Sequence, residues 1–163
     1  MGRVYVVNEN DEIIDLKERS ELLSTDITQC SILWLTDSQS NVLMAKRSKN
    51  KNTHPGLWSI ASGGMVDEGE DYDVNIVKET EEEIGLTLDP SKLTKGEKIR
   101  TYEFPAFMQW YFYTADVPIE NFVLQEEEVD EVKWYSPEEL REDLKNNPNK
   151  FTPISDYWSK KFL

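Results

Sequence analysis

The sequence contains few residues of the types that build disulfide scaffolds and histidine metal sites. Cys30 is the single cysteine in 163 residues, which excludes an internal disulfide and a CxxC metal motif. The single histidine, His54, precedes "PGLW", where we expect it to fix a turn and neither bind a metal nor act as a base. The chain has no run of about 18 apolar residues and no basic, apolar leader, so we predict neither a membrane span nor a secretory signal. We therefore expect a cytoplasmic protein without a membrane partner.

Positive charge is also scarce. Lys and Arg total 18 against 32 Asp and Glu, which gives a formal net charge of −14. This balance opposes nonspecific binding to nucleic acid, so we expect no stable nucleic-acid partner. An apolar fraction of 38%, five Trp and seven Tyr are typical of a folded chain. The length fits one domain, which we predict over residues 1–163.

Apolar runs and turn residues predict an α/β chain. Strands are expected at 3–7, near 12–15, at 30–37 and 41–47 as a hairpin, at 87–90, at 108–117 and at 129–135. Ser136, Pro137 and Glu139 form a helix start ahead of "EELREDLK", and a last helix follows Pro153. Trp58, Trp110 and Trp134 are expected in the core rather than at a substrate.

The stretch "GGMVDEGEDYDVNIVKETEEEIGL", residues 63–86, predicts a glycine loop followed by a helix that ends at Gly85. On this helix Glu79, Glu82 and Glu83 share one face, whereas Glu81 points away and is expected in solvent. Without cations, three convergent carboxylates either repel one another or hold protons with raised pKa values. A hard divalent ion such as Mg2+ accepts such oxygen ligands, and a backbone carbonyl near Gly64 could complete the set. A solvated acidic face is the alternative.

The spacing of the same stretch is specific. It reads G, five residues, E, seven residues, K-E-T-x-E-E-x-G-L over residues 64–86. This closely resembles the Nudix box, G-x5-E-x7-R-E-U-x-E-E-x-G-U, and the similarity continues in "HPGLWSIASGG" and "EVDEVKWYSPEEL". Two positions depart from the pattern. Lys78 replaces an arginine and lacks its planar fork, and Thr80 replaces an aliphatic residue, so the departures bear on efficiency more than on reaction class.

The resemblance implies a Nudix α/β/α sandwich, with a mixed β-sheet between helices and the box at the metal site. It implies a pyrophosphohydrolase that uses Mg2+, with Mn2+ as an alternative, to hydrolyse a diphosphate bond in a nucleoside diphosphate linked to another group or in a related small molecule. The implied metal ligands are Glu79, Glu82, Glu83 and the Gly64 carbonyl. Glu70 and Lys78 are the implied supporting residues.

The general base and the substrate contacts are less sharply indicated. In this family a box glutamate or a later glutamate serves as base, so we name Glu79 and Glu82 as catalytic and choose Glu128 among the later candidates 126–128. The other two of these glutamates fit a charged approach to a strand. Phosphate binding needs positive charge, and we expect it from Lys46 and Arg47 together with the Gly63 and Gly64 backbone.

The N-terminal extension, residues 1–28, narrows the resemblance to the branch that contains isopentenyl diphosphate isomerase. An isomerase-like enzyme is therefore one alternative, although "WSIASGG" offers Ala61 and Ser62 where the isomerase has a cysteine. Cys30 is expected in the core. A nucleotide-binding or sensing domain without turnover is the other alternative. Homodimers are common in the family, and the sequence leaves the oligomeric state open.

Overall fold

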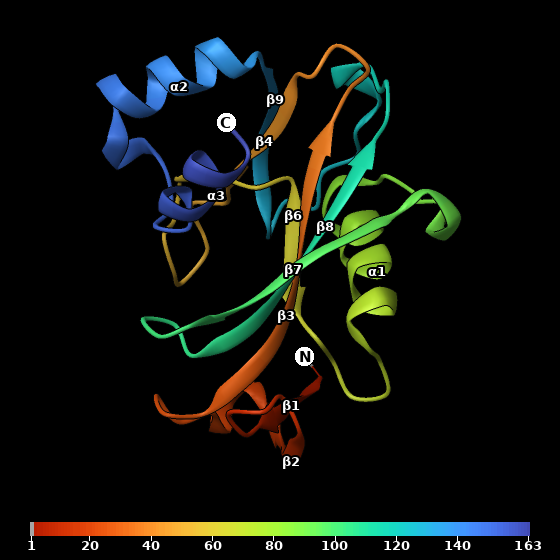
Figure 1. Ribbon diagram of the computed structural model, residues 1–163, viewed down its shortest axis with the longest axis vertical. Coiled ribbons are helices and arrows are strands. Elements are labelled where there is room, and N and C mark those ends of the chain that lie inside the picture. The colour runs from red at the N-terminus through yellow and green to blue at the C-terminus, as the bar shows by residue number, and fades with distance from the viewer. Residues whose placement is uncertain (1) are drawn as a thin grey trace.

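A computed structural model describes residues 2–163 (Figure 1). Its strands are β1 (Arg3–Val7), β2 (Ile13–Glu18), β3 (Ile27–Thr36), β4 (Val42–Arg47), β5 (Trp58–Ser59), β6 (Ser62–Met65), β7 (Thr94–Thr101), β8 (Ala106–Thr114) and β9 (Val129–Tyr135). Its helices are α1 (Tyr72–Ile84), α2 (Pro137–Asn146) and α3 (Ser155–Lys161). Short 3-10 helices are η1 (Arg19–Glu21), η2 (Pro90–Lys92), η3 (Ile119–Asn121) and η4 (Pro148–Lys150).

The nine strands form one mixed sheet around β3. Along one edge β3 pairs in parallel with β8, and β8 carries β7 as an antiparallel outer strand. The other edge of β3 pairs antiparallel with β1 and then with β6. β4 leaves β3 after one pair and forms its own antiparallel ladders with β5 and β9. The glycine strand β6 thus lies against the central strand of the sheet.

Helices cover both faces of this sheet, with α1 on one side and α2 and α3 on the other (Figure 1). Alternate side chains of β3 point to opposite faces of the sheet, and both faces are buried, so this strand contributes to the two core layers. Leu33 and Leu35 pack with the buried residues of α1, whereas Ile32 and Trp34 pack with α2 and α3. This arrangement confirms the predicted α/β/α sandwich with a mixed sheet.

Two strand predictions are wrong in part. Residues 87–90 form no strand, and the chain instead enters β7 at Thr94, which was not predicted because "TKGEKIRT" is largely polar. The expected hairpin of 30–37 with 41–47 has its turn, closed from Asp37 to Asn41, but its strands pair only at Thr36 and Val42. The reason is that both strands are buried on two faces and take other partners.

Gly63 and Gly64, which were expected in a loop, belong to strand β6 because their backbone pairs with β3. The other local predictions agree with the structure. Helices start after Ser136 and Pro153, and β1, β2, β8 and β9 lie where strands were expected. Trp58 and Trp110 are buried and Trp134 packs against the core. His54 adopts a left-handed turn conformation with φ of 48°. Within residues 2–163, no helix has the length and apolarity needed to cross a membrane.

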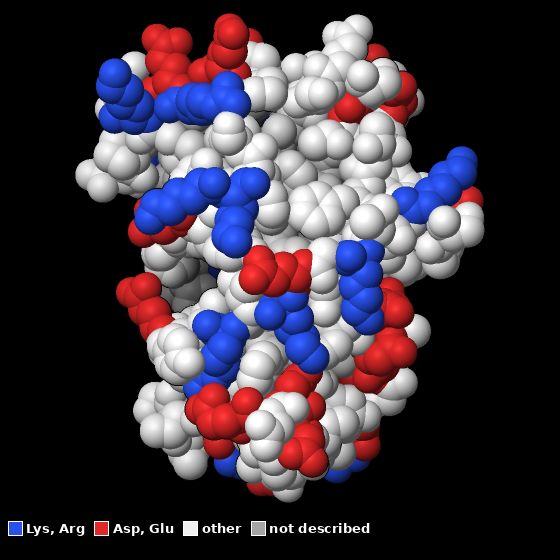
Figure 2. Space-filling view, in the orientation of Figure 1, with Lys and Arg blue, Asp and Glu red and all other residues white. Residues whose placement is uncertain are grey.

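Charges of both signs intermingle on the face seen in Figure 2. β7 crosses this face in Figure 1, and three of its cations are ion-paired with other elements. The pairs are Lys95 with Asp73, Lys98 with Asp11 and Arg100 with Glu9. The outer strand is therefore tied to α1 and to the turn between β1 and β2.

Candidate metal centre on the glycine strand and helix α1

Helix α1 is fixed at both ends by its own sequence. Asp71 caps the first turn by accepting a hydrogen bond of 2.8 Å from the amide of Val74. Gly85 ends the helix in the left-handed conformation, with φ of 70°, as predicted. The buried residues Asn75, Ile76, Thr80 and Ile84 face the sheet. These caps and this apolar stripe set which carboxylates of α1 turn toward β6.

Glycine at positions 63 and 64 lets the helix approach the strand closely. A Cβ atom on Gly64 would lie 2.7 Å from the carboxyl carbon of Glu79, so the carboxylate occupies the space that a side chain would take. A Cβ atom on Gly63 would lie 2.7 Å from the backbone oxygen of Ser31 on β3. Glu79 therefore rests directly over the backbone of the glycine strand.

Glu83 joins Glu79 at this point of the sheet. Burial raises the pKa of Glu83 well above its usual value, and the negative charges of Glu79 and Glu128 raise it further, while the Gly63 amide opposes the shift. Burial likewise raises the pKa of Glu79, against the influence of Lys78. Two half-buried carboxyl groups with raised pKa values form a site where a cation would be strongly stabilised.

Glu82 is the third carboxylate of the predicted metal-ligand set. It is exposed, as is Glu81, and among residues 2–163 no three acidic, histidine or cysteine side chains already stand together in a geometry that could hold a metal ion. Glu82 nevertheless lies three residues after Glu79 on the helix, and an exposed side chain can change rotamer. The donor set consists of hard carboxylate and carbonyl oxygens, which fits a divalent cation such as Mg2+ or Mn2+.

The Thr80 departure from the box pattern is accommodated in the core. Its hydroxyl is fully buried, donates to the Ile76 carbonyl at 2.7 Å and lies 2.7 Å from the Ser62 hydroxyl of β6. Nearby, Asn75 is buried and bonds both Ser31 on β3 and the Met65 carbonyl on β6. Polar pairs therefore hold α1 on the glycine strand at two levels.

Two residues that the sequence did not indicate, Asp67 and Arg19, extend the supporting pair of Glu70 and Lys78. The Lys78 ammonium lies 2.7 Å from Glu70 and 2.7 Å from Asp67, and Asp67 also accepts a 2.8 Å hydrogen bond from Arg19. Burial lowers the pKa of Lys78, but Asp67 and Glu70 outweigh it and the pKa is raised. Asp67 lies within the box at a position where the pattern fixes no residue type, and nothing local to Arg19 marks it, because the contact spans 48 residues.

Glu128 is brought to the end of α1 by the chain that precedes β9. The amide of Gln125 donates to the Glu83 carbonyl at 3.0 Å, and the amide of Glu128 donates to the Gln125 carbonyl at 2.9 Å. Glu128 also forms an ion pair with Lys51 in the loop that follows β4. Among the three glutamates 126–128, it alone is partly buried. This supports its choice over Glu126 and Glu127.

The two predicted phosphate contacts lie at the end of β4. Lys46 pairs with Trp58 of β5 and with Glu131 of β9 in the sheet. The Arg47 guanidinium donates to the Thr53 carbonyl at 2.9 and 3.0 Å and to the Thr53 hydroxyl at 3.0 Å, so it already braces the loop that follows β4.

Cys30 is buried in the core and unreactive at neutral pH. Burial raises the pKa of Cys30 to about 12, which leaves the thiol protonated at neutral pH. At the position of the isomerase cysteine the chain has Ala61 and Ser62, and both are buried. The described residues thus offer no reactive thiol beside the carboxylates.

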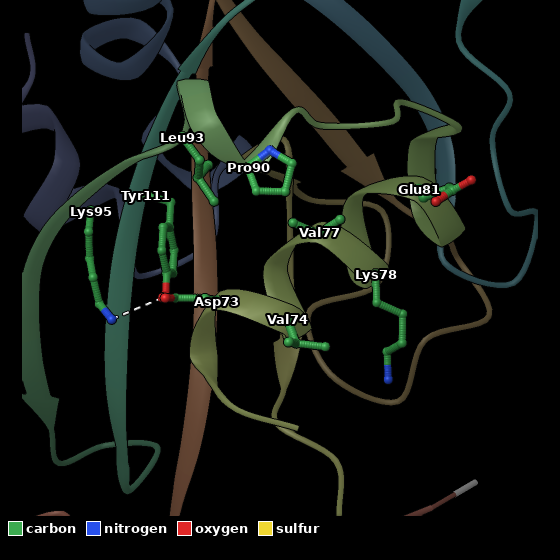
Figure 3. Close-up of a pocket in the computed structure, with 9 residues that line it drawn as sticks. All are labelled: Asp73, Val74, Val77, Lys78, Glu81, Pro90, Leu93, Lys95 and Tyr111. Carbon is green, nitrogen blue, oxygen red and sulfur yellow. Dashed lines mark hydrogen bonds and ion pairs between the residues drawn. The ribbon is translucent and has the colours of Figure 1, made fainter. Parts of the chain in front are cut away.

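A pocket of about 510 Å3 lies on another flank of α1, between the helix and β7 (Figure 3). Val74, Val77 and Leu93 line it, and the Tyr111 hydroxyl bonds Asp73 at its edge. At about 100° per residue, Val74 and Val77 are turned roughly 140 to 160° from Glu79 around the helix. The pocket therefore opens on a different side of α1 from Glu79, and Lys78 lines the pocket as well as contacting the carboxylates.

Comparisons with known proteins identify the family of the chain and agree with its fold. The family model described as the NUDIX domain matches residues 28–156. A Nudix hydrolase of Yersinia pestis is 30% identical over 139 residues, which cover 84% of this chain and 74% of the relative. The crystal structure of DR0079 from Deinococcus radiodurans matches with a TM-score of 0.84 at 20% identity and covers 99% of both chains.

A more distant structure includes a metal ion. The bifunctional NMN adenylyltransferase/ADP ribose pyrophosphatase of Francisella tularensis, complexed with AMP and a Mn ion, has a TM-score of 0.59 at 17% identity. The match covers 78% of this chain and 38% of that one. Since the NUDIX model spans most of the chain and the sandwich fold agrees, this chain belongs to the Nudix hydrolase family of pyrophosphohydrolases, which generally use divalent metal ions.

Proposed function

We propose that the protein hydrolyses the diphosphate bond of a nucleoside diphosphate linked to another group, with Mg2+ held by Glu79, Glu82, Glu83 and the Gly64 carbonyl. The observation that carries this proposal is the position of the Glu79 carboxylate against the backbone of Gly64, beside the half-buried Glu83. An acidic chain needs a cation at such a point before it can accept a phosphate group. Mn2+ offers the same octahedral oxygen chemistry as Mg2+ and is expected to substitute for it.

Each residue has a role in this proposal. Glu79 and Glu83 bind the cation from the sheet side of α1, and Glu82 turns in from the surface to join them. When bound, the cation neutralises phosphate charge, lowers the pKa of an attached water and orients it for in-line attack. Glu128 accepts the proton of the attacking water, and its ion pair with Lys51 holds it near Glu83.

The basic end of β4 supplies the substrate contacts. Lys46 and the Gly64 backbone bind phosphate oxygens, and the Gly63 amide joins them if it exchanges its hydrogen bond to Glu83 for a phosphate oxygen. Arg47 joins them if it exchanges its bonds to Thr53 for phosphate oxygens, which its bidentate fork can accept. Nucleotides are the favoured substrate class, because a Nudix-fold neighbour binds AMP with Mn. We place this activity in the cytoplasm, with a small molecule as partner.

The test is a panel of diphosphates assayed for Mg2+-dependent product release. The panel holds nucleoside di- and triphosphates, nucleotide sugars, dinucleotide cofactors including ADP-ribose, thiamine diphosphate and isopentenyl diphosphate. Wild type is compared with Glu82→Gln and with the matched control Glu81→Gln, which removes the neighbouring exposed charge on another face. We expect Glu82→Gln to lose about a hundredfold or more, since changes in groups that merely support ligands cost about 10- to 100-fold.

Three outcomes contradict the proposal. Equal activity of Glu82→Gln and Glu81→Gln would refute the metal assignment. Isomerisation of isopentenyl diphosphate without hydrolysis would favour the isomerase alternative. Thermal stabilisation by a nucleotide without product release would favour a sensing domain.

A further inference from the structure

The N-terminal hairpin, formed by β1 and β2, contacts the loop between β6 and α1. This loop, residues 66–71, is called the box loop, and the contacts of the hairpin with it are called the clamp. The main chain of Arg3 accepts a 2.8 Å bond from the Glu68 amide, and Val4 forms an isolated bridge with Asp67. The Arg3 guanidinium makes a bidentate pair with Glu68 at 2.8 and 3.0 Å. The Tyr5 hydroxyl accepts a 2.7 Å bond from the Gly69 amide. The box loop is therefore held mainly by residues that precede the family match at 28–156.

One contact of this clamp continues into the candidate metal centre. Arg19 in η1 donates to one oxygen of Asp67 at 2.8 Å, and Lys78 of α1 donates to the other oxygen at 2.7 Å. Within the described chain the Nε of Arg19 is buried without a hydrogen-bond partner, so the Nη2 bond to Asp67 is the interaction that offsets the partial burial of the guanidinium. Asp67 thus has both of its oxygens committed, one to each cation.

The same ammonium reaches the supporting and binding carboxylates. Lys78 lies 2.7 Å from Glu70 and 3.9 Å from Glu79. A lysine is a point charge on a flexible stem and does not fix its own direction, whereas the arginine of the family pattern carries a planar fork. The direction of Lys78 is therefore set by the acceptors around it, and Asp67 is the acceptor that Arg19 immobilises.

We infer that Arg19 is a positioning residue for the metal centre: through Asp67 it holds Lys78 between Glu70 and Glu79. The inference rests on the proposed function, because it assigns Glu79 to the cation. Without Arg19, Asp67 and Glu70 compete for one ammonium, and Lys78 is drawn toward the more exposed Asp67 and away from Glu79. In this chain the N-terminal segment that carries Arg19 then supplies the rigidity that an arginine in place of Lys78 would supply within the box itself.

The test uses full-length variants and two readouts. The first is Mn2+ affinity by electron paramagnetic resonance without substrate, and the second is kcat and KM for whichever diphosphate the panel identifies. Arg19→Ala removes the link, Arg19→Lys keeps its single hydrogen bond, and the double variant Arg19→Ala with Lys78→Arg restores a fork. Arg3→Ala is the matched control, because it removes an arginine pair from the same clamp at Glu68, which does not contact Lys78.

We expect Arg19→Ala to weaken Mn2+ binding and lower kcat by about tenfold each, as supporting groups of metal ligands typically do, with KM within about twofold. Arg3→Ala should stay within about twofold of wild type in both readouts, as should Arg19→Lys, and the double variant should regain most of the loss. Should Arg19→Ala fail to fold by circular dichroism, Asp67→Ala removes the acceptor and breaks the same link from the other side.

The two proposals fail in different ways. Equal Mn2+ affinity and kcat for Arg19→Ala and Arg3→Ala, in a wild type that hydrolyses diphosphates, would refute the role of Arg19 and keep the function. If the wild type binds Mn2+ but hydrolyses no diphosphate, and Arg19→Ala weakens the Mn2+ binding, the proposed function is refuted and the role of Arg19 stands. Failure of the double variant to recover would refute the equivalence with a box arginine.

Discussion

Replacement of Gly64 by alanine tests the closest contact of the candidate centre. The new Cβ would lie 2.7 Å from the Glu79 carboxyl carbon and 2.8 Å from one of its oxygens, whereas ordinary contact begins at 3.4 Å. Glu79 must therefore retreat by about 0.7 Å, the difference between 3.4 and 2.7 Å. Because the clashing atoms are the end of a flexible side chain, the retreat is a rotation of Glu79 and requires no backbone movement.

The expected effect falls on activity more than on folding. A misplacement of about 1 Å in a reacting group can cost about 100-fold in rate, which is about 2.7 kcal/mol of activation free energy. Relief by rotamer change keeps the cost in the free energy of unfolding near or below about 1 kcal/mol, the low end for overpacking. We expect the Mg2+-dependent rate to fall by about 30- to 100-fold in a protein that unfolds at nearly the wild-type urea midpoint.

Gly63→Ala is the control, since its Cβ would lie 2.7 Å from the Ser31 carbonyl oxygen, which belongs to the central strand and cannot rotate away. It should lower the free energy of unfolding by about 1 to 3 kcal/mol. Steady-state kinetics and urea unfolding of both variants decide the matter. Wild-type activity in a folded Gly64→Ala, or a larger loss of stability there than in Gly63→Ala, would refute the reasoning.

Three further predictions concern the rest of the molecule. Thr80→Val alone should destabilise the protein by about 1 kcal/mol, because the buried Ser62 hydroxyl loses its partner, and adding Ser62→Ala should recover most of this loss in urea unfolding; an additive double variant would contradict it. Burial raises the pKa of Asp143, but Lys150, Asn147 and Tyr135 outweigh it and the pKa is lowered from 3.8, so its carboxylate stabilises the fold above that pH and ceases to do so as the pH falls through the lowered value. Asp143→Asn should therefore lower the melting temperature at pH 7 with a deficit that shrinks toward pH 3, and a constant deficit would rule this out. Cys30, with its pKa raised by burial to about 12, should react with a thiol reagent such as dithionitrobenzoate only at the rate of unfolding, so fast labelling of the native protein would contradict its burial.

Much of the fold follows from local signals. The left-handed cap at Gly85 and the spacing of Ile76, Thr80 and Ile84 predicted α1 and its C-terminal end. The strands that failed to be predicted, such as β7, are polar edge elements whose position depends on β8 as a partner. The short strands β5 and β6 are likewise too brief to show a period.

The sequence by itself determined the carboxylates and their spacing on α1, because helical periodicity is a property of consecutive residues. Only the tertiary structure decided which groups meet them. Gly64 lies under Glu79 because β6 pairs with β3, and Glu128 comes near Glu83 because Gln125 bonds the end of α1. Arg19 reaches Asp67 across 48 residues because β1 bridges the box loop. Contacts of this range depend on sheet register and chain path, for which no local pattern exists.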